Sequence, residues 1–245
     1  MATSKEIPSA DHVFDSGSLD CGSGLILLIR QNMLQVPDGG ILEIRSSEPT
    51  VKSELPPWCR MVGHIHLQSI QSGEGTWRHW VQRRTDDRKE QAELEADKTK
   101  AKNFHWNLRA RKHDHQTTVY SRNFSWKSGN TIDFDRSGKT ISTLEQFFGA
   151  LLADVIHCFS AGCSRNQILL DELEGTLNGT LNSSLAAAGV EEGDSSVKTI
   201  KLVVYVTSPA SSADVQREWA QALTNSPVFQ TLLKSCEIDS RIVLL

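Results

Sequence analysis

Residues 15–35 read DSGSLDCGSGLILLIRQNMLQ, and this stretch places a cysteine, Cys21, ahead of an apolar segment. Residues 13–14 before it favour a strand, and the glycines around the cysteine indicate a turn. The apolar segment from residue 25 is continuous at first, so periodicity alone does not separate a buried strand from a helix. Its length and the polar residues 30–32 favour a helix that begins after the cysteine.

Cys21 therefore lies at the N-terminus of the predicted helix. Unpaired N–H groups and the positive end of the helix dipole stabilise a thiolate there, so we expect a lowered thiol pKa. Gly22 and Gly24 let a reaction partner approach the backbone closely. The alternative is that Cys21 is a small buried side chain that happens to precede a helix.

The elements that follow complete a small domain. A Pro-Asp-Gly-Gly turn leads to an alternating strand, then to a helical stretch interrupted at two prolines, and then to two more strands. We expect these four elements at residues 41–45, 49–61, 63–67 and 76–83. The order is β-α-β-α-β-β, which predicts a two-layer α+β sandwich.

The composition changes sharply near residue 85. Residues 86–102 hold 11 charged residues of 17 and contain no glycine or proline. These residue types favour a helix, but the only apolar ones are alanines and a single leucine. The segment therefore predicts a solvated helical connector between two domains. We place the first domain at 11–84, the linker at 85–102 and the second domain at 103–245.

The second segment also mixes strands and helices. Its most apolar element is a helix at residues 144–159, and its strongest strand signal is TIKLVVYVT at residues 199–207. Further helices are expected at 213–223 and 228–233, and further strands at 104–109, 117–124, 131–134, 172–177 and 238–245. The whole chain is therefore predicted to be an α+β protein.

The overall composition excludes several classes of protein. Hydrophobic residues make up 38% of the 245 residues, which is enough to form buried cores. A charged share of 23% and a formal net charge of −4 argue against a disordered chain and against a nucleic-acid-binding protein. The strictly apolar runs are short for a membrane span, and the polar N-terminal residues do not read as a signal peptide. Five cysteines without a CxxC motif indicate free thiols, so we expect a cytoplasmic protein.

The first segment resembles the TusA/SirA-like sulfur-carrier family over residues 11–84. The resemblance is carried by the spacing of the first cysteine motif, a Gly-Gly pair before a strand, and three later motifs, at residues 15–21, 39–40, 47–49, 54–59 and 63–64. It implies a β-α-β-α-β-β domain whose first-motif cysteine carries sulfur as a persulfide. That position is Cys21 here, and the downstream family cysteine is Cys59. Gly22 and Gly24 replace the two prolines of the family motif.

The second segment resembles the OsmC/Ohr family over residues 103–245. The matching residues lie on the apolar helix, at the start of a strand, in the strand at 199–207 and at the start of a late helix: Ser142, Leu144, Glu145, Ala150, Leu151, Ala153, Leu170, Leu173, Glu174, Ser226, Pro227 and Val228. The resemblance implies an α+β fold, an intertwined homodimer and, in peroxidase members, two cysteines. The corresponding positions here are Asp154 and Ser226.

These two substitutions change the expected chemistry. Reduction of a hydroperoxide by the family route needs a thiolate nucleophile and a resolving thiol, and neither Asp154 nor Ser226 supplies one. Cys158 lies one helical turn after Asp154, so an alignment shifted by a turn would restore one thiol. A partly buried carboxylate needs a hydrogen bond, an ion pair or a proton. We therefore expect Glu145, Asp154 and Ser226 to line a ligand-binding pocket of a protein that is not a peroxidase.

Two His-x-His pairs are candidate metal ligands. His64 and His66 read as residues of a sheet face, and His113 and His115 read as a polar turn. A zinc site needs three or four ligands, and no CxxC or HExxH motif supplies the others. We expect no metal site and no cofactor.

We expect a sulfur-relay, persulfide-carrying protein in which Cys21 accepts sulfur and Cys59 is an auxiliary thiol. Its partners would be sulfur donor or acceptor proteins, with no nucleic acid and no membrane. The apolar helix at 144–159 has more apolar surface than one small sheet covers, so we expect a homodimer through the second half. The alternative is a non-catalytic, ligand- or partner-binding OsmC-like dimer with an inert TusA-like module.

Overall fold

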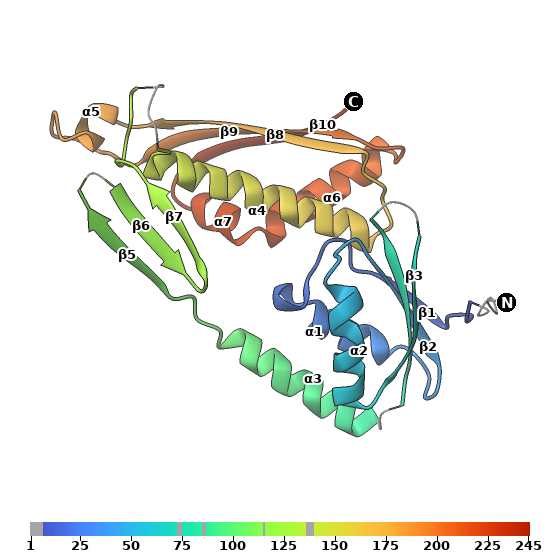
Figure 1. Ribbon diagram of the computed structural model, residues 1–245. Helices are drawn as coiled ribbons and strands as arrows, with labels where there is room; N and C mark the ends of the chain where they lie inside the picture. The colour runs from blue at the N-terminus through green and yellow to red at the C-terminus, as the bar shows by residue number, and fades with distance from the viewer. Residues whose placement is uncertain (1–6, 73–74, 85–86, 115, 136–139) are drawn as a thin grey trace. The chain divides into compact units, whose positions relative to one another are not determined.

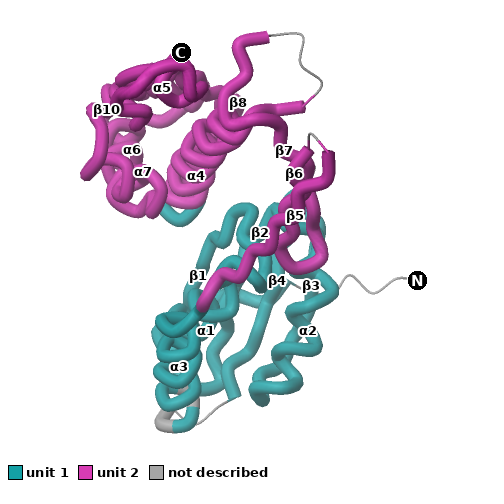
Figure 2. Tube along the Cα trace, turned by 90° about the vertical axis from the view of Figure 1, so that its left-hand side faces the viewer, with its two compact units in different colours: residues 1–104, 164–167 teal, residues 105–163, 168–245 magenta. Residues whose placement is uncertain are grey.

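The computed structural model contains two compact units (Figures 1 and 2), described over residues 7–72, 75–84, 87–114, 116–135 and 140–245. Unit 1 comprises Met1–Phe104 and Ser164–Gln167, and unit 2 comprises His105–Cys163 and Ile168–Leu245. Both units combine helices with sheets. The predicted α+β class is therefore confirmed.

Unit 1 is built on a four-stranded sheet in the order β1-β2-β4-β3. The strands are β1 (His12–Asp15), β2 (Ile41–Ser46), β3 (Ile65–Gln71) and β4 (Trp77–Gln82). β1 pairs with β2 in parallel, whereas β4 pairs antiparallel with both β2 and β3. With two helices between the first three strands, the order matches the β-α-β-α-β-β prediction.

The two helices are α1 (Leu25–Met33) and α2 (Val51–Val62). Leu25, Ile29 and Met33 are fully buried, and their spacing of four residues places them on the inner face of α1. The ambiguous apolar run is therefore a helix, as its length indicates. The interruption predicted in α2 is wrong, because the helix runs through Pro56 and Pro57. Burial of the apolar residues on both sides of the prolines outweighs the two backbone hydrogen bonds that the prolines remove.

The charged segment forms α3 (Asp87–Lys102), and it packs within unit 1. Leu94, its single leucine, is 2% exposed. The buried Arg30 of α1 makes ion pairs with Glu93 at 2.6 Å and with Asp97 at 3.0 Å. A buried guanidinium needs such partners, so one face of α3 is held on α1 rather than solvated. The helix is present, and the division into domains at 84 and 103 stays a prediction.

Unit 2 contains a sheet in the order β10-β9-β8, formed by β8 (Glu172–Leu181), β9 (Val197–Thr207) and β10 (Glu237–Leu244). Alternate residues of β9 are fully buried, namely Ile200, Leu202, Val204 and Val206. Three helices pack on that face: α4 (Thr143–Arg165), α6 (Ser212–Asn225) and α7 (Pro227–Leu232) (Figure 1). A short helix, α5 (Ser184–Ala187), joins β8 to β9.

A separate three-stranded sheet precedes α4. It consists of β5 (Leu108–His113), β6 (Gln116–Ser121) and β7 (Phe124–Ser128), in that order. The strand predicted at 104–109 begins four residues later, at Leu108. The strand predicted at 131–134 is wrong, because Asp133 Oδ1 accepts a hydrogen bond from the Asp135 N–H at 2.9 Å. Such local bonds compete with the hydrogen bonds of a sheet.

The helix α4 is long and apolar enough, by length and composition alone, to cross a membrane. A core helix of a water-soluble domain meets the same criterion. Leu151, Val155 and Phe159 of α4 are fully buried in the core of unit 2, where the Phe159 ring meets Trp219 edge-on. The expectation that no membrane is involved stays a prediction.

Candidate functional site

Cys21 lies on a tight turn between β1 and α1. It opens a single turn of 3-10 helix, η1 (Cys21–Ser23), whose N-terminus is capped by Asp20. The Asp20 carboxylate accepts a hydrogen bond from the Ser23 N–H at 2.6 Å. Gly24 then joins the turn to α1 with a φ of +94°, a conformation that glycine adopts without strain.

The Cys21 thiol is half-buried against the core of unit 1. Burial, the hydrogen bond to Glu54 and the negative charges of Glu54 and Asp20 together raise the pKa of Cys21 to about 12. The expected lowering of this pKa is therefore wrong. The dipole of α1 acts mainly within its first turn, which starts four residues after Cys21, whereas the negative charges of Glu54 and Asp20 act on the thiol.

Cys59 lies on α2 and is fully buried in the core of unit 1. Burial raises the pKa of its thiol to about 12. The structure thus places the two family cysteines differently: the Cys21 side chain is partly exposed, and the Cys59 side chain is not. Glu54, which belongs to the 54–59 motif, had no predicted role because nothing in the local spacing places it beside Cys21.

The histidines of β3 and β4 form a hydrogen-bonded chain that the sequence analysis missed. His66 Nε2 lies 2.8 Å from the Ser69 hydroxyl, which lies 2.7 Å from Nδ1 of the buried His79. Only the pairing of β3 with β4 brings these residues together. Over the described residues no group of three or more potential metal-ligating side chains occurs, and His115 lies outside that part of the chain.

Asp154 and Ser226 are in direct contact in unit 2. The Ser226 hydroxyl donates a hydrogen bond to Asp154 Oδ2 at 2.5 Å, and the Val228 N–H donates to the same oxygen at 3.1 Å. The Ser226 oxygen also accepts from the Phe229 N–H at 3.1 Å. The two side chains therefore cap the N-terminus of α7 together, and Asp154 has the hydrogen bonds that a partly buried carboxylate needs.

Glu145 does not join this pair. It is exposed at the start of α4, where its carboxylate accepts hydrogen bonds from the Ser142 hydroxyl at 2.6 Å and the Ser142 N–H at 2.8 Å. These bonds hold the pKa of Glu145 below its ordinary value. The reciprocal bond from the Glu145 N–H to the Ser142 oxygen completes a capping box. Glu145 thus stabilises the start of a helix, away from the Asp154–Ser226 contact.

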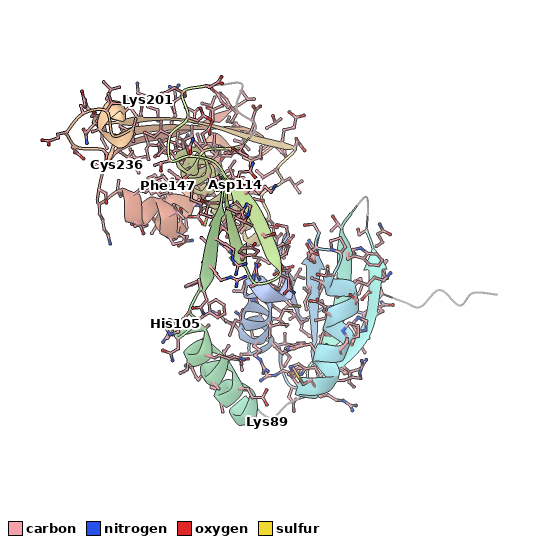
Figure 3. All side chains as sticks on the ribbon, turned by 60° about the vertical axis from the view of Figure 1, so that its left-hand side comes forward. Lys89, His105, Asp114, Phe147, Lys201 and Cys236 are labelled. Carbon is pink, nitrogen blue, oxygen red and sulfur yellow. The ribbon has the colours of Figure 1, made fainter. Side chains whose placement is uncertain are left out.

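The three other cysteines lie in unit 2. Cys163 is fully buried, and burial together with the charge of Glu218 raises its pKa to about 12. Cys158 and Cys236 are half-buried. Cys236, labelled in Figure 3, lies just before β10, and its thiol donates to the Leu232 carbonyl at 3.5 Å. None of the five cysteines, all of which lie in the described part of the chain, is joined in a disulfide.

The chain is similar to two different groups of known proteins. The N-terminal part is 28% identical over 76 residues to the sulfur carrier protein TusA of Pseudomonas putida, which covers 31% of this chain and 92% of that protein. It is 27% identical over 78 residues to the TusA of Pseudomonas savastanoi, covering 32% of this chain and 90% of that protein. No protein-family model matches the chain.

Comparison with solved structures finds a second resemblance, which covers a larger share of the chain. An OsmC-like protein from Mycoplasma pneumoniae superposes with a TM-score of 0.51 and 16% sequence identity, over 58% of this chain and 99% of that one. The chain is a TusA-like and OsmC-like fusion. The N-terminal resemblance rests on sequence, and the OsmC-like resemblance rests on the fold.

Within the TusA-like part, the turn between β1 and α1 has the cysteine of the family motif but differs from the motif in the residues that follow it. Gly22 and Gly24 stand where the family motif has prolines, and Gly24 uses its freedom because its φ is positive. Proline has a fixed negative φ, so it does not fit the backbone observed at position 24. The glycine is therefore part of a different turn that presents Cys21.

Proposed function

We propose that this protein is a sulfur carrier in which Cys21 accepts a sulfur atom as a persulfide and passes it on. The observation that carries the proposal is the position of Cys21, half-exposed on the turn between β1 and α1 of a TusA-like fold. Cys59 is fully buried, so we assign the transfer step to Cys21 alone. The partners would be sulfur donor and acceptor proteins of a reducing, cytoplasmic compartment.

The raised pKa of Cys21 limits how the carrier works. At neutral pH the free thiol is protonated, and a protonated thiol is a poor nucleophile. Sulfur transfer therefore needs removal of the Cys21 proton at the moment when a donor docks. Between transfers the same protonation protects the thiol from oxidation.

Mass spectrometry tests this proposal. Reduced protein is incubated with a cysteine desulfurase and cysteine, and the product is purified without reductant. We expect a gain of about 32 Da, one sulfur atom, on the peptide that contains Cys21, and its loss on treatment with a dithiol. The Cys59→Ser protein should still gain the sulfur, and the Cys21→Ser protein should not. Absence of an adduct on Cys21 in the unsubstituted protein would refute the carrier function.

For the OsmC-like unit we propose a homodimer. Only 28% of the most apolar part of α4 is buried, and Phe147 on α4 (Figure 3) is 39% exposed. All six residues of β5 and four of the five residues of β7 are exposed, including Leu108, Phe124 and Trp126. An apolar surface of this extent on a monomer favours association with a second copy.

We further propose that this unit is not a two-cysteine peroxidase. Asp154 and Ser226 occupy the positions that the OsmC/Ohr resemblance assigns to the cysteines, and their contact at 2.5 Å supports the alignment, because two cysteines that form a disulfide must also be adjacent. A carboxylate and a hydroxyl joined by a hydrogen bond transfer no electrons to a peroxide. Turnover of cumene hydroperoxide with a dithiol reductant, abolished by Cys158→Ser, would overturn this assignment.

The second candidate function is a non-catalytic, ligand- or partner-binding dimer with an inert TusA-like unit. The observation that favours it is the Cys21 pKa of about 12 in the free protein. The desulfurase experiment separates the two candidates. A carrier gains sulfur on Cys21, and an inert module gains none.

A further inference from the structure

The three-stranded sheet β5-β6-β7 (Figure 1) has two unlike faces. Successive residues of a strand point to opposite faces, so the pairing register assigns each residue to one of them. One face is apolar at its centre, where Ala110, Val119 and Trp126 lie side by side. The other face, called the basic face here, consists of two rows that cross the three strands: Arg109–Tyr120–Ser125 and Arg111–Thr118–Lys127.

The basic face is open to solvent and its charges are not neutralised. All residues of β5 are exposed, and so is Lys127 on β7. The Arg109 guanidinium lies 4.8 Å from the centre of the Tyr120 ring, as expected for two side chains on the same face. Among the residues that the structure describes, no carboxylate forms an ion pair with a cation of this face. The face therefore favours an anionic partner.

The charge of this part of the chain differs from that of the whole. Residues 103–132 hold five lysines and arginines and a single acidic residue, Asp114, whereas the complete chain carries a formal net charge of −4. Asp114 lies in the turn after β5, where its Oδ2 is 3.0 Å from Nδ1 of His113, and it belongs to neither row. The negative net charge of the whole chain therefore does not describe this surface, which is locally positive.

We propose that the basic face binds single-stranded RNA. Guanidinium and ammonium groups bind phosphate oxygens, and the bases of a single strand stack on aromatic rings and on the plane of an arginine side chain. The Arg109–Tyr120 pair supplies both kinds of plane. Arg111 and Lys127, in the neighbouring row, supply the phosphate contacts. This inference does not depend on the sulfur-carrier proposal, which concerns Cys21 of unit 1.

The combination of cations, a ring and hydroxyl groups favours RNA over other anionic partners. An acidic peptide would pair with the cations but has no bases to stack on the Arg109–Tyr120 pair. A duplex keeps its bases stacked on one another, so their planes do not reach a flat sheet. Thr118 and Ser125 bring hydroxyl groups into the two rows, where they can form hydrogen bonds with the ribose 2′-OH that DNA lacks.

The test measures the affinity of the full-length protein for a short, unstructured, fluorescein-labelled RNA by fluorescence anisotropy at several salt concentrations. With three cations on the phosphates, we expect a plot of log K against log salt to have a slope of about −2. Arg111→Gln and Lys127→Gln should each weaken binding by about eightfold at about 50 mM salt and reduce the steepness of the slope by about 0.7. The matched control is Lys112→Gln, which removes the same charge from the opposite face of β5 and should leave binding unchanged.

Substitutions of Tyr120 test the stacking contact. Tyr120→Leu should weaken binding by about tenfold without changing the salt slope, because it removes the ring and no charge. Tyr120→Phe retains the ring and should bind as the unsubstituted protein does. DNA of the same sequence should bind about fivefold more weakly than the RNA, and a glutamate peptide of equal charge about tenfold more weakly.

The outcomes that overturn this inference are distinct from one another. Equal weakening by Arg111→Gln and Lys112→Gln would show that binding has no preference for the basic face. A glutamate peptide that binds as tightly as the RNA would assign the face to an acidic protein partner, and an equal affinity for DNA would refute the assignment to RNA. Absence of RNA binding at the lowest salt concentration would also refute it. Uptake of sulfur by Cys21 is measured separately, so none of these results decides the sulfur-carrier function.

Discussion

The Ser226 hydroxyl lies 2.5 Å from the Asp154 carboxylate, and the two side chains hold the first turn of α7 against α4. The two residues are 72 positions apart in the sequence, and β8, β9 and α6 lie between them along the chain. The pair occupies the positions where the OsmC/Ohr resemblance expects a redox couple. In this chain the two residues cap the N-terminus of α7 and so stabilise the fold.

The first prediction concerns this cap. Ser226→Ala removes the hydroxyl that binds both Asp154 and the Phe229 N–H, so we expect a loss of about 1–2 kcal/mol in the free energy of unfolding. Asp154→Asn should cost a similar amount. Because the residues share hydrogen bonds, the double variant should lose less than the sum of the two. Urea denaturation measures all three, and Asp239→Asn on the exposed side of β10 is the control. Strict additivity would contradict the contact.

The second prediction concerns the attachment of α3. Arg30→Met keeps the buried stem of the side chain and removes the ion pairs to Glu93 and Asp97, whose carboxylates are partly exposed. We expect α3 to open more often, with a loss of about 1–2 kcal/mol in local stability. Trypsin should then cut faster within residues 89–102. The exposed pair Lys98–Glu95 supplies the control Glu95→Gln, which removes that ion pair, keeps every trypsin site and should not change the cleavage rate. Equal cleavage of both variants would show that Arg30 does not hold the helix.

The third prediction is a pH dependence that arises at His79. Burial, followed by the nearby charges of His66 and Lys52, lowers the pKa of His79 to about 4. Between pH 4 and 6.5 the unfolded chain therefore binds a proton that the folded chain does not, and the free energy of unfolding falls as the pH is lowered through this window. The loss approaches about 3.4 kcal/mol once the pH is below the folded-state pKa.

Urea denaturation at a series of pH values measures this dependence. His79→Gln should flatten the curve below pH 6.5, and His105→Gln, at an exposed histidine (Figure 3), should leave it unchanged. A curve for His79→Gln that parallels that of the unsubstituted protein would place the titrating group elsewhere.

The fourth prediction tests the dimer. Phe124 is 66% exposed on β7, so Phe124→Lys introduces a charge into the apolar surface without disturbing the core of unit 2. We expect the sedimenting mass at low micromolar concentration to change from that of a dimer to that of a monomer. Val190→Lys, at a 71% exposed residue after α5, is the matched control and should remain dimeric. A monomeric mass for the unsubstituted protein would refute the proposed homodimer.

The sequence by itself determined the features that depend on neighbouring residues. The order of strands and helices in unit 1, the helix α4 and the strand β9 follow from patterns of apolar residues that are complete within each segment. The position of Cys21 on a turn before a helix is equally local. The resemblance to the TusA/SirA-like family then suggested a role for that cysteine. The sequence similarity to TusA proteins covers the same part of the chain.

Only the tertiary structure decided which distant groups share an environment. The charge of Glu54 on α2 acts on Cys21, 33 residues earlier, and this carboxylate together with burial reversed the expected direction of the Cys21 pKa. The charged segment packs as a helix on α1 because the buried guanidinium of Arg30 needs carboxylate partners, and Glu93 and Asp97 of α3 provide them. Asp154 and Ser226 met because α7 folds back onto α4. Charge–charge effects and hydrogen bonds depend on distance in space, which residue spacing along the chain does not specify.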